Sequence, residues 1–108
     1  MPAMKIASKK IDGNRVFIRS EKVAFREVDG EVLIVPIRMS TSDPTGVYRL
    51  NRTASFIWMQ LDGRHSVDTI VQHMMERFEV SQTEARSDAS ELIFDLLSFD
   101  AIEEPDSQ

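Results

Sequence analysis

The stretch VYRLNRTASFIWMQL, residues 47–61, changes the period of its apolar side chains part-way along. Over residues 47–50 the alternation typical of a strand places Tyr48 and Leu50 on one face. From Asn51 onward the apolar residues lie three or four positions apart, as on one side of a helix. These residues are Ala54, Ile57, Trp58 and Leu61. The sequence therefore predicts a short strand followed at once by an amphipathic helix whose tryptophan packs in the core.

Capping residues mark the ends of three helices. Asn51 or Thr53 can cap the first, and Asp62-Gly63 is expected to end it with a tight turn. Ser66 can cap the second helix, and the capping-box pattern of residues 81–84 (SQTE) begins the third. Apolar stripes continue through both helices: Val67, Ile70, Val71, Met74 and Phe78, then Ala85, Ala89, Leu92, Ile93, Leu96 and Leu97. Ile102 lies just beyond and is expected to close the core.

Upstream, residues 22–28 and 31–36 read as two strands joined by Asp29-Gly30, a pair that suits a two-residue hairpin turn. Pro36 should end the second strand because it lacks the backbone N–H of a ladder donor. The turn-forming residues within 37–46 predict a loop, and residues 16–18 could form a further short strand.

Together these elements predict an α+β fold in one domain. A small N-terminal antiparallel sheet of two or three strands is followed by a three-helix bundle, an order similar to that of a winged helix. We expect the domain to span residues 21–104. Residues 1–20 are expected to form an N-terminal extension, part of it mobile.

Composition limits the kinds of protein that this chain can be. The 108 residues include no cysteine, which excludes disulfides and thiolate metal sites and fits the cytoplasm. No signal peptide is evident, and no apolar run approaches the roughly 20 residues of a membrane span. We therefore expect a cytoplasmic protein without a membrane partner.

The chain carries little that suggests catalysis. His65 and His73 do not share a helical face, so the spacing indicates surface histidines and no metal site. The four glycines lie singly in predicted turns, and no nucleophile motif is present. The sequence thus predicts a protein without enzymatic activity, metal or cofactor.

Charge bears on whether the helices bind nucleic acid. The net charge is −5, and residues 53–108 hold 3 Lys/Arg against 12 Asp/Glu. The third helix, which would enter a DNA groove, carries one acidic stripe: Glu84, Asp88, Glu91 and Asp95. Phosphates would repel these carboxylates, although a solvated helix face would look the same. The charge pattern therefore argues against a winged-helix transcription regulator, which stays only as an alternative.

Several segments resemble the PqqD family at their mutual spacing. They are Arg26-Glu27-Val28-Asp29-Gly30-Glu31 with Val32-Leu33, Leu50-Asn51-Arg52-Thr53-Ala54, Ile57-Trp58, Leu61-Asp62-Gly63, Ser66-Val67-Asp68-Thr69-Ile70, and Asp88 ahead of Leu92, Leu96 and Leu97. The loop at residues 37–45 looks longer than is usual in the family, and Asp100-Ala101 stands where a glycine is common.

The resemblance implies a winged-helix-like domain that binds the leader of a ribosomally made precursor peptide, as a RiPP recognition element does. Such a domain presents the leader to a modifying enzyme, which is a radical SAM enzyme in pyrroloquinoline quinone synthesis. The leader would add as a strand beside the third strand, next to the third helix. The implied peptide-binding residues are Val47, Tyr48, Arg49, Leu50, Asp88, Glu91, Leu92 and Asp95. An exposed strand edge also permits either a monomer or a strand-exchanged homodimer.

Overall fold

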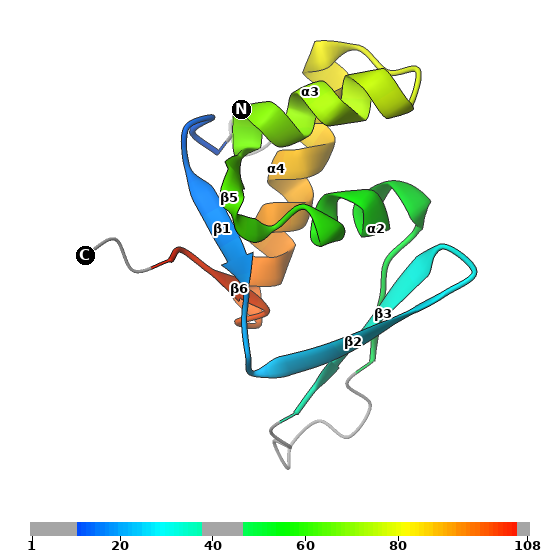
Figure 1. Ribbon diagram of the computed structural model, residues 1–108, viewed down its shortest axis with the longest axis vertical. Coiled ribbons are helices and arrows are strands. Elements are labelled where there is room, and N and C mark those ends of the chain that lie inside the picture. Colours follow the sequence, from blue (N-terminus) through cyan, green and yellow to red (C-terminus); the bar gives the residue numbers. More distant parts are fainter. Residues whose placement is uncertain (1–10, 38–46, 106–108) are drawn as a thin grey trace, which may run out of the picture.

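The computed structural model describes residues 11–37 and 47–105. Within these residues the chain forms six strands and three helices (Figure 1). The strands are β1 Val16–Arg19, β2 Val23–Val28, β3 Glu31–Pro36, β4 Tyr48–Arg49, β5 Asp62–Ser66 and β6 Ile102–Glu103. The helices are α2 Arg52–Met59, α3 Val67–Arg77 and α4 Gln82–Ser98. The predicted α+β class is confirmed; the likeness to a winged helix stays a prediction.

Two antiparallel sheets flank the helices. One has the order β2-β3-β4, with β2 and β3 joined by the predicted Asp29-Gly30 turn, in which both residues have positive φ. The other has the order β5-β1-β6 and brings residues from both ends of the chain together. In Figure 1 the β2–β3 hairpin lies below α2, and Gly30 in its turn lies near the Arg52 side chain at the start of that helix.

The second sheet corrects the expected link between the first two helices. Helix α2 ends at Met59, and residues 62–66 form β5 where a tight turn was predicted. Gly63 has a φ of +84° and lies against Ile18 of β1, where a Cβ atom would come within 3.1 Å of the Ile18 Cδ1 atom. The missing side chain of Gly63 therefore lets β5 pair closely with β1. Because the two strands are far apart in the sequence, no local pattern reveals this.

The caps of the three helices follow the sequence. Asn51, and not Thr53, caps α2: its side chain accepts a hydrogen bond of 2.8 Å from the Ala54 N–H. Ser66 and Ser81 cap α3 and α4 in the same way, each accepting from the N–H three residues on.

The core lies where the apolar stripes meet the two sheets. Trp58, Ile57, Leu61 and Ile93 are each at most 1% exposed, and Ile102 closes the core as expected. Phe17, which is 1% exposed, and Ile11 also belong to this core. Residues 11–20 are thus packed against the helices, while residues 1–10 lie outside the described residues. The domain boundary at residue 21 stays a prediction.

Candidate functional site

Strand β4 forms one edge of the β2-β3-β4 sheet, and no further strand lies beside it in the described part of the chain. It pairs on one side with β3, through Leu33 opposite Arg49 and Ile34 opposite Tyr48. The next residue, Leu50, donates its N–H to the Val32 carbonyl at 2.8 Å. Because backbone groups point to alternate sides along a strand, the N–H and C=O of Arg49 point away from β3. No hydrogen bond from the described part of the chain reaches them, so this edge can accept another strand.

Ser55 of α2 fixes this edge strand. Its hydroxyl accepts a hydrogen bond from the Val32 N–H at 2.8 Å and donates to the Leu50 carbonyl at 3.2 Å. The side chain is buried, so these bonds link β3, the end of β4 and the first turn of α2 away from water. No sequence pattern predicts this role, because Ser55 looks like an ordinary residue between apolar positions of a helix.

A cleft of about 270 Å³ lies next to β4, between α2 and α4. Helix α4 contributes the predicted residues Asp88, Glu91, Leu92 and Asp95. Helix α2 contributes residues that the sequence reading missed, namely Asn51, Thr53, Ala54 and Ile57. Their spacing on one helical side could have suggested a shared surface, but only the packing of α2 on α4 shows that it faces the acidic stripe.

Tyr48 connects β4 to this cleft. Its hydroxyl donates to the Asp95 Oδ2 atom at 3.3 Å, and its ring packs on Phe99 at a centroid distance of 4.8 Å. Burial and, secondly, the nearby Asp95 charge raise the pKa of Tyr48. The predicted residue Tyr48 is therefore half-buried between strand and helix, at one end of the cleft.

None of the predicted strand residues lines the cleft, although Tyr48 bonds to Asp95, which does. Leu50 is 2% exposed, and its N–H and C=O are bonded to Val32 and Ser55, so it holds the strand in place and does not face the cleft. Arg49 points to the opposite face of the sheet, where its guanidinium lies 3.7 Å from Glu31. Val47 is 58% exposed. The structure thus brings the four α4 residues together with Tyr48 and leaves the side chains of Val47, Arg49 and Leu50 elsewhere.

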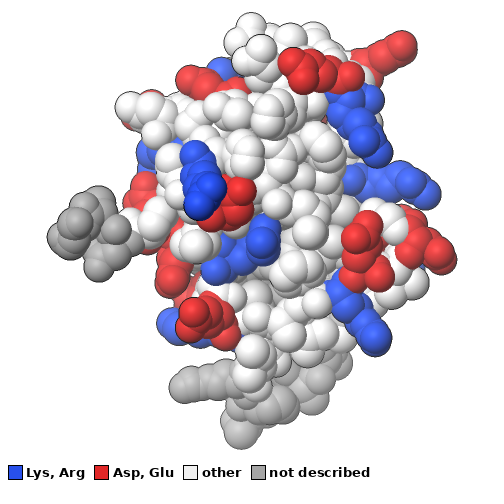
Figure 2. Space-filling view, in the orientation of Figure 1, with Lys and Arg blue, Asp and Glu red and all other residues white. Residues whose placement is uncertain are grey.

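Among the described residues, the carboxylates of the cleft have no basic partner. No Lys or Arg lines the cleft, and the charged residues there are Asp88, Glu91 and Asp95. Within residues 11–37 and 47–105, no ion pair or side-chain hydrogen bond involves Asp88 or Glu91. On the face seen in Figure 2, basic groups are interspersed with acidic ones and form no continuous basic surface of the kind that binds phosphates.

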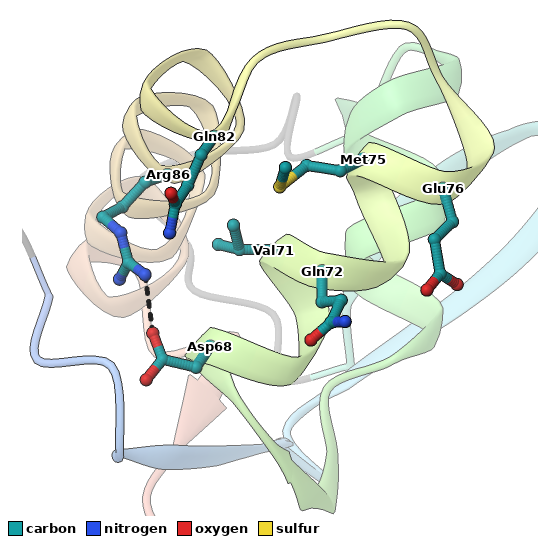
Figure 3. A pocket seen from close by; sticks show the side chains of 7 residues that line it. All are labelled: Asp68, Val71, Gln72, Met75, Glu76, Gln82 and Arg86. Atoms are coloured by element: carbon teal, nitrogen blue, oxygen red, sulfur yellow. Dashed lines mark hydrogen bonds and ion pairs between the residues drawn. The ribbon is translucent and has the colours of Figure 1, made fainter.

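A second cleft, of about 490 Å³, lies between α3 and α4 (Figure 3). The Arg86 Nη2 atom contacts the Asp68 Oδ1 atom at 2.6 Å across one end of it, and Figure 3 shows Glu76 at the other end. Val71 and Met75 form its apolar part. Because Arg86 and Asp68 satisfy each other, this cleft presents less unbalanced charge than the one beside β4.

The side chains of His65 and His73 contact each other in the fold. Their rings lie 5.6 Å apart in a T-shaped arrangement, with His65 Nδ1 at 2.9 Å from Asp62 Oδ1 and His73 Nδ1 at 2.5 Å from Gln60 Oε1. Among the described residues, no group of three or more His, Cys, Asp or Glu side chains could hold a metal ion. Nor is any helix among them long and apolar enough to cross a membrane.

Comparisons with known proteins agree with the resemblance read from the sequence. The family model described as coenzyme PQQ synthesis protein D (PqqD) matches residues 32–100. No curated protein matches the chain. The solved structure of TbiB1 in complex with the TbiA(beta) leader peptide is 20% identical, with a TM-score of 0.68 over 83% of this chain and 99% of that one. Lasso peptide synthetase B1 complexed with the leader peptide is 23% identical, with a TM-score of 0.67 over 81% and 96%. Both share this fold.

Proposed function

Because this chain belongs to the PqqD family, we propose that it binds the leader of a ribosomally made precursor peptide and presents it to a modifying enzyme. The chemistry would be done by that enzyme, for example a radical SAM enzyme in the synthesis of pyrroloquinoline quinone or of another peptide-derived product. The two structures of the same fold were solved with leader peptides bound, which supports this choice.

The observation that carries the proposal is the open edge of β4 beside a cleft. An extended peptide would pair with the outward N–H and C=O of Arg49 and continue the β2-β3-β4 sheet. Main-chain hydrogen bonds would supply affinity, and the cleft between α2 and α4 would select side chains. The residues proposed for this site are Val47, Tyr48, Arg49, Leu50, Asp88, Glu91, Leu92 and Asp95, with Leu50 holding the edge strand in register through its bonds to Val32 and Ser55.

The acidic side of α4 supports a peptide over a nucleic acid. Asp88, Glu91 and Asp95 are exposed and would repel a phosphate backbone. The same carboxylates would speed association with a leader that carries Lys or Arg, an effect that weakens with salt.

An NMR titration of the ¹⁵N-labelled chain with the leader of a precursor encoded near its gene tests the proposal. Shifts are expected to cluster at residues 47–50 and 88–95. The proposal is wrong if no such precursor moves these signals, or if the chain instead binds duplex DNA saturably at physiological salt.

A further inference from the structure

We infer that the peptide bound along β4 is read at every second residue, and that the residue facing the cleft between α2 and α4 is lysine or arginine. This inference rests on the proposed function and adds the chemical class and spacing of the side chains that are recognised.

The backbone register sets the alternation. A peptide residue that pairs with the outward N–H and C=O of Arg49 lies opposite Arg49, so its side chain points to the outer face, where Arg49 meets Glu31. The peptide residues on either side of it point the other way, to the side on which Tyr48 contacts Asp95. Only these alternate residues can reach the cleft.

The spacing of α4 matches this alternation. Side chains on one face of a strand repeat every ~6.6 Å, and one turn of a helix rises ~5.4 Å. Asp95, Glu91 and Asp88 lie on successive turns of α4 and all line the same cleft. A peptide strand that ran along α4 would therefore bring consecutive inward-facing residues to about consecutive turns of the helix.

The cleft has the chemistry of a site for one long cationic side chain. Ala54, Ile57 and Leu92 give it apolar walls, and carboxylates carry its charge. Lysine and arginine combine an apolar stem with a charged tip, and about 270 Å³ is room for one of them. Of the three acids, Asp95 already accepts from Tyr48, which leaves Asp88 and Glu91 to receive the cation.

The basic residues of α2 and α4 do not supply that cation. Arg52 begins α2, but its guanidinium lies at the hairpin turn, where a Cβ atom on Gly30 would come within 3.2 Å of the Arg52 Nη1 atom. Arg86, on α4, is held by Asp68 in the other cleft. Within the described residues no cation pairs with Asp88 or Glu91, so a bound peptide can supply one.

Selection of a randomised twelve-residue peptide library by mRNA display on the full chain tests the inference. The expected result is enrichment of Lys or Arg at one position, with a second selected position two residues away and free variation between them. In a synthetic consensus peptide, Lys→Glu at the first position should weaken binding about tenfold, and changes at the intervening residue should matter little.

Variants of the protein test whether Asp88 and Glu91 are the carboxylates that receive the peptide cation. Asp88→Asn combined with Glu91→Gln should abolish the preference for Lys or Arg, whereas Glu84→Gln, on the same helix but outside the cleft, should retain it. Enriched peptides without a basic residue, or an unchanged preference in the double variant, would overturn this inference while leaving peptide binding intact. If the library yields no binder at all, the proposed function fails as well.

Discussion

The hydroxyl of Tyr48 on β4 donates a hydrogen bond to the carboxylate of Asp95 on α4, at 3.3 Å. This contact joins Tyr48 to the acidic side of the cleft. Because Tyr48 is the only tyrosine of the chain, the absorbance of its phenolate reports on the candidate site. It also holds the edge strand to the helix that would face a bound peptide.

The ionisation of Tyr48 follows from this contact. Burial and then the Asp95 charge disfavour the phenolate, so the pKa of Tyr48 lies above its usual 10.0. Titration of the absorbance near 295 nm should show this directly, and Asp95→Asn should lower the pKa without restoring the usual value, because burial is the larger cause. Since the folded pKa is raised, the associated stability is present below pH 10 and is lost as the pH rises through the folded value. An unchanged midpoint in Asp95→Asn would contradict the contact.

Ser55→Ala should destabilise the fold by about 1–3 kcal/mol, because it leaves the buried Val32 N–H and Leu50 C=O without their shared partner. Urea unfolding measures the change. Ser87→Ala, an exposed position on α4, is the control and should change the free energy of unfolding much less. Equal effects of the two substitutions would show that the Ser55 bridge contributes little.

Asp62→Asn should remove part of the acid sensitivity of the fold. Burial favours protonation of Asp62, but hydrogen bonds from the His65 ring and from the Arg64 and His65 backbone outweigh it and lower its pKa to about 2. The stability that this depressed pKa provides is present above the ordinary 3.8 and is lost as the pH falls toward 2. Unfolding free energies measured from pH 5 downward should therefore converge for the wild type and the variant.

Asp88→Asn is the control for that series, since the Asp88 carboxylate accepts no hydrogen bond from the described residues. Its difference from the wild type should be small throughout. A difference for Asp62→Asn that stays constant with pH would argue against the His65 contact.

Arg49→Pro should weaken peptide binding about tenfold or more, because proline removes the outward N–H that an added strand would use. The inward bonds of Leu50 to Val32 and of Ser55 to Leu50 do not involve this group, so the fold should persist by circular dichroism. Arg49→Ala keeps the N–H and is the matched control for the lost side chain. Equal affinity of the proline and alanine variants, measured by fluorescence polarisation with a labelled leader, would exclude pairing at this edge.

The sequence by itself determined the elements that depend on near neighbours. The hairpin turn at Asp29-Gly30, the caps at Asn51, Ser66 and Ser81, and the apolar faces of the helices all follow from residues a few positions apart. The acidic stripe of α4 was also visible, because helical spacing depends only on position along the chain.

Only the tertiary structure decided what these elements face. The pairing of β1 with β5 and β6 joins distant segments, so Gly63 looked like a helix end and proved to lie in a strand. The Ser55 bridge and the α2 wall of the cleft arise from packing between elements, which no local period encodes. Arg52 and Arg86 do not pair with Asp88 and Glu91, because their side chains lie near Gly30 and on Asp68, which are contacts across the fold.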